Sequence, residues 1–111
     1  MRFALVCLLL AACKAPVPAD SQDGEAILAA HCASCHGPDG RPPAAMVARL
    51  GVRELTSPEP RQRVTAELVA RQVTKGSTNK LMPSFDGVLH EIQITAVAKW
   101  VADPRFVTPR P

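Results

Sequence analysis

The chain has 111 residues, with 13 Lys and Arg against 10 Asp and Glu, which gives a formal net charge of +3 at pH 7. This length allows one small domain beyond any cleaved segment, and the weak, unclustered positive charge gives no reason to expect nucleic acid as a partner. Aromatic side chains make up only 4% of the residues. A domain with so small a core commonly depends on a disulfide, a metal or another bound group.

Residues 1–12 have the organisation of an export signal. Arg2 precedes the apolar run Phe3–Leu10, which is too short to span a bilayer. The letters LAAC that end at Cys13 resemble the lipobox of bacterial lipoproteins. This resemblance implies that residues 1–12 are removed and that Cys13, then the first residue, carries several acyl chains that anchor it stably. The alternative is an ordinary cleaved signal peptide in which Cys13 has no special role.

Residues 13–23 contain two prolines, small residues and acids without an apolar period, and they predict an extended tether. At about 3.1 Å per residue, such a tether would hold the domain roughly 25–30 Å from the membrane. Lys14, directly after the lipobox cysteine, resembles the signal for outer-membrane sorting in Gram-negative lipoproteins. We therefore expect an exported, periplasmic protein that is lipid-anchored to a bacterial membrane, with its folded domain in residues 24–111.

Two thiols and an imidazole follow in the pattern that is typical of covalent c-type haem attachment. The residues are Cys32, Cys35 and His36 in the stretch CASCH. Two cysteines three positions apart can add across the two vinyl groups of a porphyrin and form two thioether bonds. The next residue then lies beneath the iron, where its Nε2 can serve as an axial ligand. We expect one haem c in the chain, and folding that depends on its insertion.

Two other interpretations of the cysteine pair are weaker. A thioredoxin-like redox site needs a βαβ context, and no strand-like run precedes Cys32. A structural zinc site needs four ligands, usually as two pairs, and a site built with His31 and His36 would crowd its ligands into six residues. Because Cys7 leaves with the signal, lipid at Cys13 and haem at the pair account for every remaining cysteine, which also removes the disulfide expected of an exported chain.

Apolar periodicity predicts helices and no strands, so we expect an all-α domain. Residues 21–33 form the first helix, capped by Ser21 or Asp20, and Pro58 and Pro60 lie in a loop. Gly76 stops a later helix. The predicted helices are 21–33, 44–50, 64–75 and 91–102, with a loop at 77–87.

Four side chains are candidates for the second axial ligand of the iron. His31 is too close to the attachment motif to reach the other face of a porphyrin, and His90 lies where the last helix begins, facing solvent. Met46 lies in an apolar helical pattern, where methionine is usually core filler. Met82 follows a helix stop and precedes Pro83, which stiffens the loop. The sequence therefore favours Met82.

These features together resemble the class I c-type cytochromes, small proteins with one haem, and the resemblance runs from about residue 24 to 103. It rests on the CASCH motif and on Leu-Met82-Pro-Ser-Phe85, which is similar to the family's Met-Pro-x-Phe loop. It implies that helices and loops wrap around one haem ligated by His36 and Met82. The stretch CHGPDGRPPAA resembles the family's CHG-x-x-G…GP and implies that the carbonyl of Pro43, with that of Pro42 as the alternative, accepts from His36 Nδ1. Here Arg41 and Pro42 replace the usual glycine.

The resemblance also predicts that the first and last helices cross. Gly24 and Leu28 match the small and large residues of the family's N-terminal helix, and Val97 and Trp100 match the pair on its C-terminal helix. A glycine without a side chain would let the two helices approach closely.

We therefore expect an electron carrier, not an enzyme. It would exchange electrons with a protein donor and acceptor, contact the membrane through Cys13, and be a monomer. Arg71, Lys75 and Lys80 flank the methionine loop and would steer an acidic partner, unless they are an ordinary solvated surface. Two alternatives remain: an enzyme or a gas- or peroxide-reacting domain with an open iron site, and a haem subunit of a larger oxidoreductase.

Overall fold

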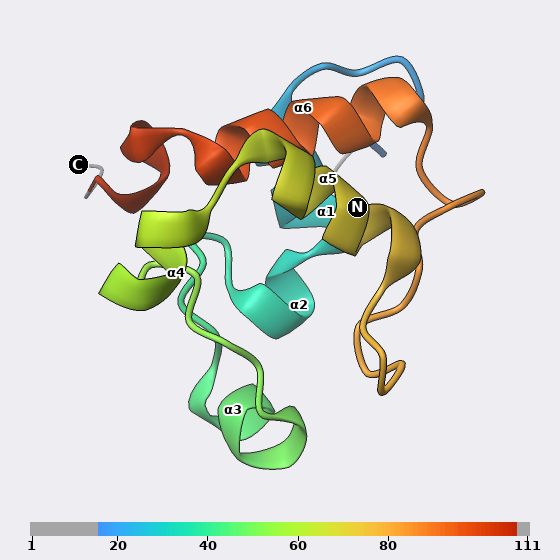
Figure 1. Cartoon of the computed structure of the whole chain (residues 1–111). Helices are drawn as coiled ribbons and strands as arrows, with labels where there is room; N and C mark the ends of the chain where they lie inside the picture. Colours follow the sequence, from blue (N-terminus) through green and yellow to red (C-terminus); the bar gives the residue numbers. More distant parts are fainter. Residues whose placement is uncertain (1–15, 109–111) are drawn as a thin grey trace, which may run out of the picture.

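The computed structural model describes residues 16–108, and these form α-helices, one 3₁₀ helix and loops (Figure 1). No strand forms in this part of the chain, where one isolated bridge pairs Asp86 with Leu89. The all-α prediction is confirmed. None of the helices within 16–108 is both long and apolar enough to cross a membrane. In chain order, the helices are α1 (Gly24–His31), α2 (Ala33–His36), α3 (Ala44–Leu50), α4 (Pro58–Arg63), α5 (Ala66–Lys75), α6 (Glu91–Ala102) and the 3₁₀ helix η1 (Pro104–Val107).

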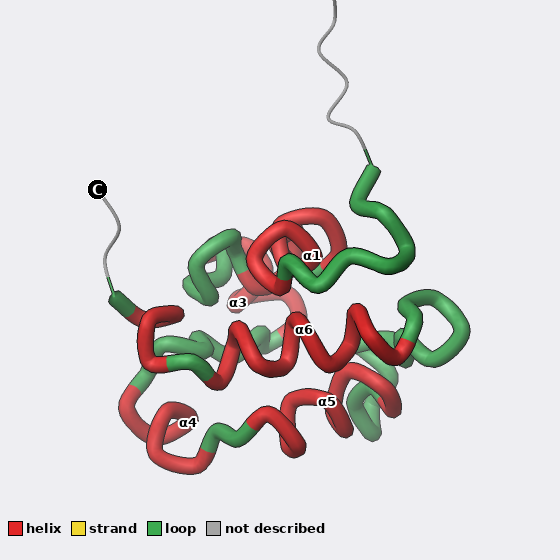
Figure 2. Tube along the Cα trace, turned by 90° about the horizontal axis from the view of Figure 1, so that it is seen from above, coloured by secondary structure: helices red, strands yellow, loops and turns green. Residues whose placement is uncertain are grey.

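The long helix α6 is the centre of the fold, and α1 and α5 pack against it from two sides (Figure 2). Gly24 lies at the crossing of α1 and α6. A Cβ built on this residue would lie only 2.7 Å from the Cβ of Trp100 and would also meet the carbonyl oxygen of Ala96. The expected crossing of the first and last helices is therefore present, and glycine is needed there because the two backbones approach so closely.

One hydrophobic core joins the three packed helices. Leu28 of α1 and Val97 of α6 are each 1% exposed, as the predicted helix crossing requires. Trp100 is partly buried and packs on this core, and its ring meets the Phe106 ring edge-on at 5.9 Å between centroids. The buried cluster consists of Ile27, Leu28, Val73, Leu89, Ile94, Val97, Val101 and Phe106.

The first helix differs from the prediction at both ends. The N-cap is Asp23, whose side chain accepts from the backbone N–H of Ala26, and Ser21 instead accepts from Asp23. The helical path breaks at Cys32, and α2 then carries the rest of the motif. The segments 44–50 and 91–102 are helical as predicted, and α5 begins at Ala66, two residues later than expected.

Helix α4 was not predicted, because two prolines indicated a loop. Both prolines fall in its first turn, where backbone N–H groups have no helical partner and proline is tolerated. Arg61 ties α4 to the end of α6: its guanidinium donates to the carbonyls of Val101 at 2.6 Å and Asp103 at 3.2 Å. The same group lies 5.5 Å from the centroid of the Phe106 ring.

Helix α3 lies away from the α1–α5–α6 bundle (Figure 1). None of its residues is buried, and Val47 is 47% exposed. The expectation that Met46 fills the core is therefore wrong. Met46 is only half-buried and does not belong to the core cluster, because the helix that carries it does not pack on the bundle.

Part of the expected tether lies on the domain. Val17 packs against the core, and the carbonyl of Pro18 accepts from Gln93 Nε2 at 3.1 Å and from the Ser21 N–H at 3.0 Å. Gln93 is 3% exposed, and its Oε1 accepts from the N–H of His90 at 3.0 Å. Residues 17–21 thus form a strap on α6 and satisfy a buried amide.

Candidate functional site

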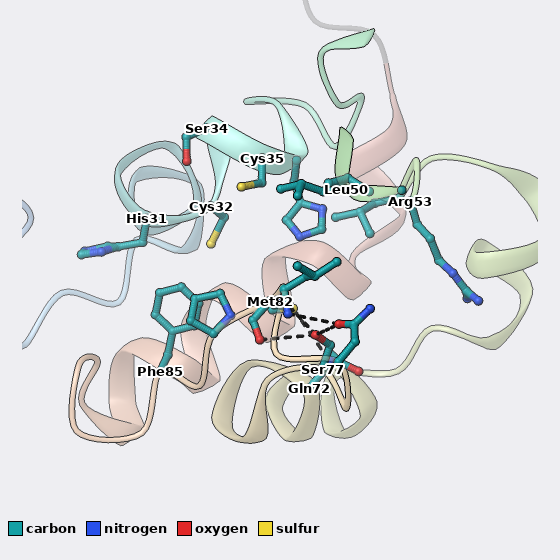
Figure 3. A pocket seen from close by; sticks show the side chains of 17 residues that line it. His31, Cys32, Ser34, Cys35, Leu50, Arg53, Gln72, Ser77, Met82 and Phe85 are labelled. Atoms are coloured by element: carbon teal, nitrogen blue, oxygen red, sulfur yellow. Dashed lines mark hydrogen bonds between the residues drawn. The ribbon is translucent and has the colours of Figure 1, made fainter. Parts of the chain in front are cut away.

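A cavity of about 630 Å³ opens between α2 and the loop that follows α5 (Figure 3). This volume is in the range of sites that hold a cofactor-sized molecule. A second, more apolar hollow of about 250 Å³ adjoins it, bounded by α4, α5 and α6. Five residues line both spaces, and three of them were predicted site residues. The shared residues are Cys32, His36, Leu55, Gln72 and Met82.

The two thiols lie on one wall of this cavity (Figure 3). Cys32 is the N-cap of α2, and Cys35 lies one turn further on. Both are free cysteines, so they do not form a disulfide with each other. Burial, together with the neighbouring Cys35, raises the pKa of the Cys32 thiol to about 11. Redox and nucleophilic cysteines have lowered pKa values, so this thiol does not suit a thioredoxin-like site.

His36 ends α2 and lies on the same wall. Burial lowers its pKa, which favours the neutral imidazole that binds metals. The backbone of Arg53 lies beside the ring and opposes this shift, but Nδ1 has no hydrogen bond of ordinary geometry within the described residues. A buried imidazole nitrogen without a partner is unusual, and Nδ1 is the atom for which the sequence predicts a proline carbonyl as acceptor.

Pro43 lies at the N-cap of α3 and does not line the cavity. Its carbonyl accepts from the N–H groups of Met46 at 2.9 Å and Val47 at 3.2 Å. The hydrogen bond between this carbonyl and His36 Nδ1 therefore stays a prediction.

Met82 lies on the opposite wall, in a loop held by a network of hydrogen bonds (Figure 3). Two hydrogen bonds join Ser77 to Met82. The Ser77 N–H donates to the Met82 carbonyl at 3.0 Å, and the Met82 N–H donates to Ser77 Oγ at 2.9 Å. Beyond Met82, Ser84 Oγ donates to the Thr74 carbonyl at 2.6 Å and the Phe85 N–H to the Val73 carbonyl at 2.9 Å. The loop is thus fastened to the C-terminal turn of α5.

Gly76 makes this fastening possible. Its φ of +73° is a conformation that L side chains rarely adopt, and a Cβ there would lie 2.8 Å from the backbone carbonyl carbon of Pro83. The helix stop predicted at this residue is confirmed, since its N–H bonds the Gln72 carbonyl as the C-cap of α5. The glycine therefore serves both the helix end and the position of Met82.

Two residues at the site were not identified from the sequence. Ser77 positions the backbone of Met82, and Gln72 donates from Nε2 to Met82 Sδ at 3.8 Å. Both lie within five residues of Gly76, so they were near a recognised helix stop. A serine and a glutamine at a helix end are otherwise ordinary, and periodicity does not indicate which of them faces the sulfur.

The other candidate ligands are placed less favourably. His31 is exposed at the mouth of the cavity, and His90 is exposed at the start of α6, as expected. Met46 does not line the cavity. Among residues 16–108, no group of three or more His, Cys, Asp and Glu side chains is arranged to hold a metal ion. The zinc interpretation therefore has no support in the described structure.

Comparisons with known proteins agree with this chemistry. A family model described as cytochrome C oxidase, cbb3-type, subunit III matches residues 19–101. The chain is similar to the solved structure of the KustC0563 c-type cytochrome, with 28% identity and a TM-score of 0.64 over 72% of this chain and 94% of that one. A point mutant of that cytochrome gives 28% identity and a TM-score of 0.63, over 72% and 95% of the two chains. No curated protein gives a significant match.

The residues of the cavity fit the cofactor of such proteins. Two free thiols, a neutral imidazole and a thioether line one apolar space, and these are the groups that attach and ligate a haem c. The family match covers most of the chain, and haem c with its iron is the cofactor it implies. The chain therefore belongs to the family of cytochrome C oxidase, cbb3-type, subunit III, and is a monohaem c-type cytochrome with an electron-transfer role.

Proposed function

We propose that this protein carries one electron at a time on a haem attached through Cys32 and Cys35 and ligated by His36 and Met82. The observation that carries the proposal is the convergence of these four residues on one cavity, although Met82 lies 46 positions after His36 in the chain. They come from two walls, α2 and the 77–85 loop, so each wall would offer the iron one ligand atom.

When bound, the haem supplies an iron that alternates between Fe(III) and Fe(II). His36 offers a neutral imidazole because burial lowers its pKa. Met82 offers a soft thioether, which favours Fe(II), and the apolar walls of the cavity disfavour the additional charge of Fe(III). Because the 77–85 loop is fastened to α5, the thioether would be held in place in both oxidation states, and little of the chain would have to reorganise.

The partner side of the proposal is a redox protein with an acidic surface. Leu81, next to the proposed ligand, is 51% exposed and lines the cavity mouth. Lys75, the last residue of α5, and Lys80, within this loop, are both exposed. An apolar contact flanked by cations suits brief docking at the cavity edge, with the charges steering the encounter.

A second candidate is a haem subunit of a larger oxidoreductase, and the matching family, which is described as a subunit of an oxidase, favours it. Both candidates use the same ligands and differ only in how long the partner stays bound. The open-site alternative is less favoured, because the hydrogen bonds of Ser77 and Ser84 hold Met82 at the cavity.

The membrane attachment is a separate part of the proposal. Cys13 and the signal in residues 1–12 lie outside the described residues. We propose that Cys13 carries the lipid, that the domain is a periplasmic monomer in its free form, and that Lys14 directs it to the outer membrane. Since Val17 and Pro18 lie on α6, only three residues separate Cys13 from the strap. At most about 14 Å can then separate them, which is shorter than the spacer expected from residues 13–23.

The experiment that tests the carrier proposal compares Met82→Ala with Met46→Ala. Met46 is the matched control because it is half-buried outside the cavity. Each variant, loaded with haem, is titrated potentiometrically and exposed to carbon monoxide in the ferrous form. We expect wild type and Met46→Ala to have similar, high reduction potentials and not to bind carbon monoxide. Met82→Ala should bind carbon monoxide and have a lower reduction potential. Carbon monoxide binding by the wild type at low concentration would identify an open-site protein instead.

A further inference from the structure

Gln72 is the one side chain that donates a hydrogen bond to the sulfur of Met82 in the described structure. Its Nε2 lies 3.8 Å from Met82 Sδ (Figure 3). Gln72 also lines both the larger cavity and the apolar hollow beside it. The amide therefore lies at the junction of the two spaces, beside the proposed ligand atom.

The backbone around this contact is fixed on both sides. The Gln72 carbonyl accepts from the Gly76 N–H at 2.8 Å, which closes the last turn of α5. Met82 is held by its two bonds to Ser77, and the chain after it is bonded to the same helix end. The backbones that carry the amide and the sulfur are thus bonded to the same end of α5, so the exposed Gln72 side chain starts from a fixed position beside Met82.

The chemistry of a thioether allows two bonds at once. Its sulfur has two lone pairs and is a weak acceptor, so one pair can bind iron while the other accepts an N–H. We propose that Gln72 is a positioning residue that acts on the haem through Met82, orienting the sulfur and raising the reduction potential. This inference rests on the proposed ligation by Met82.

The direction of the effect follows from electrostatics. The N–H dipole points its positive end at the sulfur, which disfavours the additional positive charge of Fe(III) and draws electron density away from the metal–ligand bond. Hydrogen bonds beside a metal ligand are one of the means by which a protein tunes a haem. Removing the donor should therefore shift the equilibrium toward Fe(III), strengthen the bond between Met82 and the ferric iron, and make Met82 harder to displace from the ferric protein.

The test uses Gln72→Leu, which removes the donor and keeps most of the volume. We expect the Fe(III)/Fe(II) equilibrium to shift about threefold to tenfold toward Fe(III), the range of one modest hydrogen bond. At 59 mV per tenfold for one electron, this lowers the potential by about 28–59 mV. Imidazole should displace Met82 from the ferric protein only at about threefold higher concentration. Gln62→Leu is the matched control, because Gln62 is an exposed glutamine of α4 that lines neither space.

A second variant separates the donor from packing. In Gln72→Glu the introduced carboxylate cannot donate when ionised, but it can when protonated. Its potential should therefore lie below that of Gln72→Leu at neutral pH and rise toward the wild-type value as the pH falls through the pKa of the introduced group. A purely structural role for Gln72 would not produce this recovery.

The outcomes distinguish the inference from the proposed function. The weak far-red ferric band reports sulfur on iron and is recorded for every variant. If the band is present throughout and only the Gln72 variants shift in potential and imidazole binding, the inference stands. If the band is present but Gln72→Leu matches the control within twofold, the inference is overturned while Met82 ligation stands. If the wild type lacks the band, the ligation itself is wrong and the inference falls with it.

Discussion

Gly24→Ala tests whether the crossing of α1 and α6 holds the domain together. Alanine is the better helix former by about 1 kcal/mol, so propensity alone predicts a more stable protein. In the structure, however, the new Cβ would lie 2.7 Å from the Cβ of Trp100 and 2.9 Å from the backbone carbonyl carbon of Ala96. Neither atom can turn away by rotation of a side chain, so the two helices themselves must move.

The cost can be worked from these distances. Carbon atoms settle about 3.5–4.0 Å apart, so α1 and α6 must separate by roughly 1 Å, which loosens Leu28 against Val97. Overpacking of a core costs about 1–3 kcal/mol. With a rigid backbone as the obstacle we take the upper end, and after the gain in propensity we expect a net loss of about 2 kcal/mol.

The assay is denaturation by guanidinium of the haem-loaded protein, followed by far-UV circular dichroism. Ala29→Gly is the control on the same helix: Ala29 is exposed, so this change should cost about 1 kcal/mol through propensity alone. Wild-type stability for Gly24→Ala, or an increase, would refute the close approach of the two helices.

Three further predictions concern the strap, the methionine loop and acid stability. Gln93→Leu removes the donor to the Pro18 carbonyl and should lower the free energy of unfolding by about 1–3 kcal/mol in guanidinium denaturation; a free energy equal to that of the wild type would contradict this. Gly76→Ala forces an alanine to a φ of +73° against the Met82 loop, so the far-red band should weaken and stability fall by about 1–3 kcal/mol. The pKa of Asp103 is lowered to about 2 by hydrogen bonds from a neighbouring arginine, so its stabilisation is present above pH 4 and lost as pH falls toward 2. Asp103→Asn should therefore be less stable than wild type at pH 6, and the difference should disappear near pH 2 in acid titrations.

The parts of the fold that could be predicted are those with a local signal. The last helix has a clean apolar period and ends before Pro104, and its predicted bounds agree with α6. Gly24 matched the small residue that the resemblance places at the helix crossing, and the structure has that crossing. The CASCH motif carries its chemistry in its spacing, and comparison confirms the haem protein it predicts.

The parts that could not be predicted depend on tertiary contacts. Arg61 looked like a loop arginine, because only the fold places it beside the Val101 carbonyl at the end of α6. Residues 17–21 read as a polar, Pro-containing spacer, and nothing local indicates that Gln93, far along the chain, donates to them. The same holds at the site for Gln72, whose role appears only when α5 and the methionine loop lie side by side.

The most direct test of the central claim is the ferric absorption spectrum of the full chain produced with haem-maturation machinery, with mass spectrometry of the polypeptide. The account predicts one covalently bound haem, a low-spin spectrum with the weak far-red band of sulfur ligation, and loss of that band in Met82→Ala but not in Met46→Ala. A covalent haem with a high-spin spectrum would contradict the proposed ligation by Met82, and a chain without covalent haem would contradict the attachment at Cys32 and Cys35.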